Sequence, residues 1–205
     1  MNRVPNGSEL YVNFVDFAKA FDSVHWHSLQ KILRAYGIPS HLAEIIKSFY
    51  DNFTYCVGDG DILFEVHTGA RQGCVMSTLL FNLAVNWIMR RTTEDQIRGI
   101  RWTPFSYLED LDYADDLALL SHTHKHIQEK MQRLNTFAKQ VGLNISSKKT
   151  EIIALNTTNT RPVQIDNEEL PYTDSFTSLG SIISRDGGTD LAFRAVSPRP
   201  ETRLT

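Results

Sequence analysis

Two adjacent carboxylates, Asp115 and Asp116, form the end of a Tyr-Ala-Asp-Asp segment. Apolar residues precede the segment around Leu111 and follow it from Leu117 to Leu120. Because an Asp-Asp pair disfavours a strand and favours a turn, this pattern predicts a β-hairpin with two negative charges at its tip. Like charges this close resist joint ionisation, and a divalent cation would relieve the conflict. The segment is therefore a candidate metal site that needs a further ligand from elsewhere in the chain.

A third carboxylate stands at the end of another predicted strand. Residues 10–16 are a β-branched and aromatic run that ends at Asp16, and the chain becomes helical from Ser23 onward. A carboxylate at the end of a strand, just before a helix, is a common place for catalytic groups. Asp16 and Asp115 are 99 positions apart (115 − 16), so only the fold can bring them together. We expect the three acids to converge at one sheet edge, where hard oxygen ligands suit Mg²⁺.

The rest of the pattern predicts the elements that would position these acids. Apolar residues at helical spacing predict four helices, and alternating or β-branched runs predict strands between them. The expected helices cover 23–36 with an N-cap at Ser23, the segment from Leu42 to Phe49, 77–91 with Leu79 on its apolar stripe, and 124–141 ending at Gly142. The expected strands are 10–16, a hairpin of 53–57 and 62–67, the acidic hairpin at 106–121, 151–155, and short strands within 163–183. This order indicates an α+β fold with an antiparallel sheet backed by helices.

Composition limits the class of protein. The chain has 205 residues, 41% of them hydrophobic and 22% charged, which suits one globular domain. Two cysteines, Cys56 and Cys74, fit a reducing compartment, and the absence of a signal peptide or a long apolar run predicts an intracellular protein with no membrane partner. The net charge of −3 opposes strong nucleic-acid binding. The cations that could form a local basic patch come late in the chain, at Lys125, Lys130, Arg133, Lys139, Lys148 and Lys149.

Five segments occur in an order that resembles a known family. Phe14 to Asp22, Arg71-Gln72-Gly73, the Tyr-Ala-Asp-Asp segment, Gly142 to Glu151 and Phe176 to Gly180 follow one another. They closely resemble motifs A to E of the reverse transcriptases of non-LTR, LINE-like retrotransposons. The resemblance spans roughly residues 8 to 190.

This resemblance implies a right-hand polymerase palm over residues 8–190, lacking most of the fingers and thumb. Residues 191–205 have no periodicity and are expected to be disordered or an aberrant tail. The implied activity is RNA-directed DNA polymerisation, in which two Mg²⁺ ions, or Mn²⁺ in their place, support transfer from a dNTP to a primer 3′-hydroxyl. An RNA template, a DNA primer and a dNTP are the implied partners, with weak nucleic-acid binding by this fragment.

The resemblance also assigns roles to individual residues. Asp16, Asp115 and Asp116 match the metal-binding catalytic acids, and Lys149 matches a lysine that stabilises or protonates the leaving pyrophosphate. Phe21 is either the aromatic that rejects a ribose 2′-hydroxyl or a core side chain. The nucleotide-binding matches are Phe17, Phe21, Arg71, Gln72 and Gly73, and the primer-grip matches are Leu179 and Gly180.

Alternative functions remain open at this stage. The chain is either a polymerase palm with surviving catalytic acids or an inactive retrotransposon-derived remnant that acts at most as a binding module. Another palm enzyme, an RNA-dependent RNA polymerase or a nucleotide cyclase, is opposed by Phe21 and by the Tyr-Ala-Asp-Asp form. Because fingers and thumb motifs would lie outside residues 1–205, we expect this chain to extend primers poorly.

Overall fold

The structure is a computed structural model that describes residues 8–50, 54–57, 62–65, 69, 74–113, 116–159, 161–178 and 181–184. It is a mixed α/β arrangement with antiparallel strand pairing. The helices are α1 (Ala20–Ser23), α2 (Trp26–Ala35), α3 (Ser40–Ser48), α4 (Val75–Thr93) and α5 (His124–Val141). The strands are β1 (Leu10–Val15), β2 (Phe17–Ala18), β3 (Thr54–Val57), β4 (Ile62–Glu65), β5 (Ile100–Thr103), β6 (Ser106–Leu108), β7 (Asp110–Tyr113), β8 (Asp116–Ser121), β9 (Asn144–Ile145), β10 (Glu151–Leu155), β11 (Gln164–Ile165), β12 (Glu168–Glu169), β13 (Ser175–Ser178) and β14 (Ser181–Ser184).

A four-stranded antiparallel sheet of order β10-β1-β8-β7 forms the centre of the molecule. Its inner strand β1 is covered on both faces, which explains its nearly continuous apolar sequence. Tyr11 and Val15 belong to the larger core on the helical side, whereas Val12 and Phe14 belong to a smaller core on the opposite side. Successive side chains of a strand point to opposite faces, so one strand supplies both cores.

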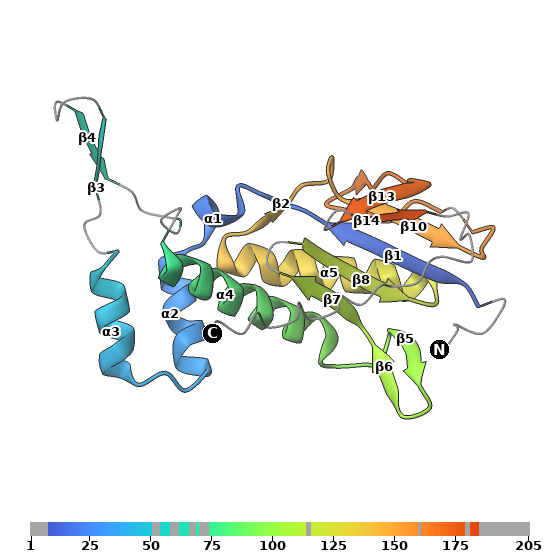
Figure 1. Cartoon of the computed structure of the whole chain (residues 1–205), viewed down its shortest axis with the longest axis horizontal. Coiled ribbons are helices and arrows are strands. Elements are labelled where there is room, and N and C mark those ends of the chain that lie inside the picture. The colour runs from blue at the N-terminus through green and yellow to red at the C-terminus, as the bar shows by residue number, and fades with distance from the viewer. Residues whose placement is uncertain are drawn as a thin grey trace, which may run out of the picture.

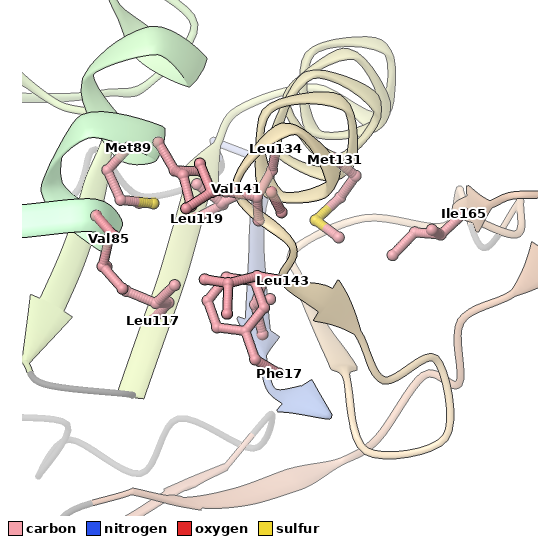
Figure 2. Close-up of a cluster of buried hydrophobic side chains, with 14 of the residues drawn as sticks. Phe17, Val85, Met89, Leu117, Leu119, Met131, Leu134, Val141, Leu143 and Ile165 are labelled. Atoms are coloured by element: carbon pink, nitrogen blue, oxygen red, sulfur yellow. The ribbon is translucent and has the colours of Figure 1, made fainter. Parts of the chain in front are cut away.

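Helices α4 and α5 cover one face of this sheet (Figure 1). Figure 2 shows side chains from both helices meeting those of β8, together with residues of β2 and β11. α5 begins where Thr123 Oγ1 accepts a hydrogen bond from the His126 N–H at 3.2 Å, which satisfies one of the free amides of a helix start. The labelled core residues are Phe17, Val85, Met89, Leu117, Leu119, Met131, Leu134, Val141, Leu143 and Ile165.

The end of α5 is fixed against the start of the chain by Gly142. Its φ of 91° is left-handed, and a Cβ atom there would lie 2.4 Å from the Ser23 carbonyl oxygen. Only glycine tolerates both conditions without strain. The chain then enters β9, which pairs with β2 just after Asp16. This close approach ties the C-terminal half of the chain to the strand end that carries the first candidate acid.

Most predicted elements are confirmed, with three corrections. Ser23 is not the cap of the long helix: it ends α1, its hydroxyl donates to the Lys19 carbonyl at 2.8 Å, and α2 begins after His25. The segment expected to form one acidic hairpin contains β7–β8 and part of a separate hairpin, β5–β6. Leu79 is 60% exposed and is not on the buried side of α4. Residues 191–205 lie outside the described residues, and no helix of the described part is long and apolar enough to span a membrane.

Candidate active site

The paired ends of β1 and β8 bring two of the predicted acids to one place. Val15 pairs with Leu117 in an antiparallel register, so the next residue of β1 and the preceding residue of β8 are Asp16 and Asp116. On the other side, Tyr113 pairs with Asp116, and β7 and β8 are separated by positions 114 and 115 alone. Asp115 itself lies outside the described residues. The hairpin predicted from sequence is confirmed, with Asp116 as an exposed first residue of β8.

The backbone of Asp16 is held from two directions. Its N–H donates to Thr150 Oγ1 at 3.3 Å, and its carbonyl oxygen accepts from the Ser146 N–H at 2.8 Å. Thr150 is fully buried, so this hydroxyl is a fixed acceptor. Sequence reasoning assigned no role to Ser146 or Thr150. The signal available was the position of Thr150 directly after Lys149 in the fourth motif.

The same loop brings Lys149 to the Asp16 carboxylate. Lys149 Nζ lies 3.5 Å from Asp16 Oδ2, and the two side chains are 71% and 42% exposed. Although the Asp16 side chain is partly exposed, its Oδ2 atom is buried and accepts no hydrogen bond from the described residues. A buried carboxylate oxygen without a donor is expected to require a cation. This oxygen therefore fits a hard divalent metal, with Lys149 as a nearby positive charge in its absence.

The described residues alone do not complete a metal site. Among them, no group of three or more His, Cys, Asp and Glu side chains is arranged to hold a metal ion. The predicted set of three acids includes Asp115, which lies outside the described part of the chain. The structure therefore places Asp16 and Asp116 on adjoining strand ends, and the participation of Asp115 stays a prediction.

The two aromatics assigned to the nucleotide differ in their environment. Phe17 is buried in the main core and pairs through β2 with Ile145, so its side chain serves packing and its contact with a nucleotide stays a prediction. Phe21 is half-buried and stacks on Phe81 with ring centroids 4.5 Å apart and an interplanar angle of 28°. Its ring thus packs against α4, and its effect on a sugar stays a prediction.

The remaining assigned residues fall outside the described part of the chain. Arg71, Gln72, Gly73, Leu179 and Gly180 are not described, but their neighbours are. Before the first group, the Gly69 N–H donates to the Val24 carbonyl at 3.0 Å, which anchors the chain beside α1 and α2. Before the second group, Phe176 of β13 stacks on Phe14 of β1 with centroids 4.0 Å apart. The first flanking segment is therefore attached between α1 and α2, and the second is attached to β1, which ends one residue before Asp16.

The described strands also carry a perturbed acid, Asp110 at the start of β7. Burial, reinforced by the nearby negative charge of Asp112, raises the pKa of the Asp110 carboxyl to about 6. Desolvation disfavours the charged form of any acid. Asp110 lies at the opposite end of β7 from Tyr113, the residue that pairs with Asp116. The raised pKa therefore belongs to an acid at the end of the hairpin away from the candidate site.

Comparison with known proteins identifies the family. A family model described as "Reverse transcriptase (RNA-dependent DNA polymerase)" matches residues 3–183. The chain belongs to the reverse transcriptase family. The resemblance predicted from the five ordered segments is therefore confirmed, including the non-LTR retrotransposon branch, because the similar curated proteins are Pol polyproteins of R2 elements.

These relatives are much longer than this reverse transcriptase chain. It is 27% identical over 185 residues to the R2 Pol polyprotein of Popillia japonica, covering 89% of this chain and 29% of the relative. It is 27% identical over 195 residues to that of Nasonia vitripennis, covering 87% and 18%, and 30% identical over 142 residues to that of the Drosophila melanogaster element R2DM, covering 68% and 13%. The chain spans less than a third of each of these relatives.

Solved structures support the fold of the reverse transcriptase family. The telomerase of Candida albicans, in complex with a TWJ fragment of telomeric RNA, matches with a TM-score of 0.58 at 12% identity and covers 86% of this chain and 29% of that one. The Candida tropicalis telomerase, in the same type of complex, matches with a TM-score of 0.56 at 14% identity and covers 79% and 28%. At these identities the likeness establishes a shared fold and nothing finer.

Proposed function

We propose that this chain is the palm of an RNA-directed DNA polymerase and adds deoxynucleotides to a DNA primer on an RNA template. The observation that carries the proposal is the arrangement at the end of β1. Asp16 and Asp116 occupy adjoining strand ends in register, and Asp16 Oδ2 is buried without a hydrogen-bond donor from the described residues. Membership of the reverse transcriptase family supports the reaction class, and this family generally depends on a divalent metal.

Asp16, Asp115 and Asp116 are proposed to hold Mg²⁺, with Mn²⁺ as a substitute. When bound in pairs, such ions activate the primer 3′-hydroxyl and neutralise the leaving pyrophosphate. The chain contributes the fixed geometry. Thr150 and Ser146 hold the Asp16 backbone on both sides, so the carboxylate needs little rearrangement to accept a cation.

Other side chains are proposed to act on the substrates. Lys149, whose Nζ lies 3.5 Å from Asp16 Oδ2, is proposed to stabilise or protonate the pyrophosphate as it leaves. Phe21 would limit the space for a ribose 2′-hydroxyl, the group that distinguishes RNA from DNA precursors. Arg71, Gln72 and Gly73 are proposed to contact the incoming dNTP, with the backbone of Phe17. Leu179 and Gly180 are proposed to contact the primer.

Metal binding and primer extension by the purified chain test this proposal together. Mn²⁺ titration followed by electron paramagnetic resonance should show a site that Asp16→Asn weakens by at least about tenfold, since an amide cannot replace the charge of the carboxylate. Glu169→Gln is the matched control, because Glu169 is an exposed acid on β12 and is not one of the proposed metal ligands. Extension of a DNA primer on an RNA template should be weak, require Mg²⁺ and disappear in Asp16→Asn.

Two results would separate the alternatives. Equal Mn²⁺ binding by the wild type, Asp16→Asn and Glu169→Gln would show that these acids form no metal site. A metal site that depends on Asp16, in a chain that extends no primer under any condition, would instead favour the inactive remnant that acts only in binding.

A further inference from the structure

The β5–β6 hairpin exposes three large aromatic side chains. Trp102 is 45% exposed, Phe105 98% and Tyr107 50%, and all three lie within six consecutive residues. A single exposed apolar residue is ordinary, but a cluster of this size on one hairpin marks an interaction surface. The proposed polymerase chemistry at Asp16 uses none of them.

The tip of this hairpin is held in one shape by local hydrogen bonds. Thr103 Oγ1 and Ser106 Oγ are 2.5 Å apart, and the Phe105 N–H donates to Thr103 Oγ1 at 3.3 Å. The Arg101 guanidinium donates to the Pro104 carbonyl at 2.9 Å. A tip fixed in this way presents its aromatic rings at a small entropic cost.

The base of the hairpin is joined firmly to the core. Ile100 is buried, and a Cβ atom on Gly99 would lie 2.2 Å from the Leu108 carbonyl oxygen. The Gly99 N–H also donates to Glu109 Oε1 at 2.8 Å. The close crossing of the two strands at Gly99 makes the hairpin a rigid extension of the body of the protein.

Positive charge lies beside one of the exposed rings. Arg101 pairs directly with Tyr107 across the two strands, so both side chains share one face. The Arg101 backbone N–H also reaches His122 Nε2 at 3.4 Å. Among the described residues no carboxylate forms an ion pair with Arg101. Its charge is therefore available to a ligand.

We propose that the β5–β6 hairpin is a stacking platform for single-stranded RNA. Exposed aromatic rings stack on bases of any sequence, and an adjacent guanidinium pairs with phosphate. An RNA duplex hides its base faces, so the surface suits an unpaired strand. A protein partner would match the rings but would leave the charge of Arg101 without a role. The inference rests on the proposed function, in which RNA is the template.

The platform lies away from the proposed catalytic centre. β6 leads directly into β7, and Asp116 pairs with Tyr113 at the far end of β7 (Figure 1). β7 has four residues and therefore spans about 13 Å. The hairpin is thus placed to hold the RNA strand outside the reacting end, where its loss would weaken RNA binding without removing metal.

Fluorescence anisotropy with a labelled oligouridylate of about 16 nucleotides tests the platform on the full chain. Trp102→Ala and Phe105→Ala should each weaken RNA binding by about fivefold or more, because each would remove one stacked base. Arg101→Gln should reduce the dependence of affinity on salt concentration, since one phosphate contact is lost. Phe49→Ala is the matched control: Phe49 is 53% exposed, follows α3 and is far from this hairpin in the sequence. It should bind RNA as the wild type does.

Tryptophan fluorescence gives a second measurement. Trp26 and Trp87 are half-buried, whereas Trp102 is exposed, so RNA should quench the wild-type emission and quench Trp102→Phe much less. Unchanged affinity in both Trp102→Ala and Phe105→Ala would overturn the proposal. So would loss of self-association in Phe105→Ala with RNA affinity intact, which would identify a second copy of the chain as the partner. Asp16→Asn should retain RNA binding by the hairpin, so failure of the platform is distinguishable from failure of the metal site.

Discussion

The two ends of the β7–β8 hairpin use charge in opposite ways. At the turn end, Asp16 Oδ2 is buried without a hydrogen-bond donor from the described residues, and Lys149 approaches it only to 3.5 Å from a largely exposed position. At the other end, Lys130 is completely buried and its ammonium contacts three acceptors. At the turn end a carboxylate oxygen is left for a ligand, whereas at the other end the buried charge is paired within the protein.

The buried ammonium of Lys130 is fully hydrogen-bonded within the protein. Its three donors meet the carbonyl oxygens of Glu109 at 2.8 Å and Leu120 at 2.7 Å and the Glu109 carboxylate at 2.6 Å. An ammonium has three N–H donors, so none is left without an acceptor. Burial lowers the pKa of Lys130, and the hydrogen bond with Glu109 opposes that shift. The carboxylate also accepts from the Arg98 and Gly99 amides, which fixes it in place.

A second ion-pair cluster extends the same end of the molecule. Arg98 is nearly buried and binds Asp95 at 2.7 Å and Glu129 at 2.8 Å. The hydrogen bond that Arg98 donates to Asp95 raises the pKa of the guanidinium, and that same bond lowers the pKa of Asp95. Arg133 joins the cluster through Asp95 and donates to the Thr92 carbonyl at the end of α4. Buried charge here connects helices to the sheet, whereas the carboxylates at the turn end are proposed to bind metal.

The largest expected change in stability comes from removing the ammonium of Lys130. Lys130→Met should lower the free energy of unfolding by about 3 to 5 kcal/mol, because it leaves Glu109 as an uncompensated and largely buried charge. Urea denaturation monitored by circular dichroism measures the change. Lys125→Met on the same helix is the control, since Lys125 is 82% exposed and should change stability by less than about 0.5 kcal/mol. Equal stability of the two variants would show that the buried pair adds nothing.

A smaller effect is expected from Asp110, where β7 begins. Its folded pKa of about 6 lies above the ordinary value of 3.8, so ionising it costs more in the folded state than in the unfolded state. The cost is absent below about pH 4, grows as the pH rises and is complete above about pH 6. Allowing for partial solvent exposure, Asp110→Asn should raise the free energy of unfolding by about 1 to 2 kcal/mol at pH 7.5.

The pH dependence is the decisive part of that experiment. The gain in Asp110→Asn should shrink steadily between pH 6 and pH 4 in urea titrations at several pH values. Glu169→Gln is the control, because Glu169 is an exposed acid on β12 and is not among the charges that shift the pKa of Asp110. A gain for Asp110→Asn that is constant from pH 4 to pH 7.5 would mean that the carboxyl ionises normally in the folded protein.

Much of the proposed catalytic end could be predicted from sequence because its signals are local. The apolar run that ends at Asp16 predicts a strand end, and the Asp-Asp pair predicts a turn. β1 confirms the strand end, and the β7–β8 pairing confirms a hairpin in which Asp116 is already the first residue of β8. The order of the motifs assigned Lys149 to the leaving pyrophosphate, but it did not predict the approach of Lys149 to Asp16. Their actual contact depends on Thr150 and Ser146, whose hydrogen bonds exist only once β10 pairs with β1.

The end of the β7–β8 hairpin around Lys130 could not be predicted in the same way. Composition placed Lys130 and Arg133 among the cations of a possible basic surface, and this interpretation is wrong for Lys130, which is fully buried. A lysine at a helical position gives no sequence signal for burial, because its acceptors come from Glu109 and Leu120 on other elements. Helical periodicity also predicted an apolar face on α3 and α4. Whether such a face is buried depends on which other elements pack against it, and the local sequence does not give that information. The apolar residues of those faces that are exposed are Leu42, Ile45, Phe49 and Leu79.

The smallest change in stability, and the sharpest test of the contrast, is expected from Lys149→Met at the turn end. Lys149 is 71% exposed, so its removal should change the free energy of unfolding by less than about 0.5 kcal/mol.

The Mn²⁺ affinity of Lys149→Met should change in the opposite direction to that of Asp16→Asn. A cation bound to Asp16 is repelled by the ammonium of Lys149, so Lys149→Met should tighten Mn²⁺ binding about two- to fivefold. Primer extension, if Lys149 assists the leaving pyrophosphate, should fall although the metal binds more tightly. Lys148→Met is the control for loss of one positive charge nearby and should change Mn²⁺ affinity less. Weaker Mn²⁺ binding in Lys149→Met would mean that the lysine supports the site instead of competing with the metal. The turn end would then resemble the end around Lys130, where the charges are paired within the protein.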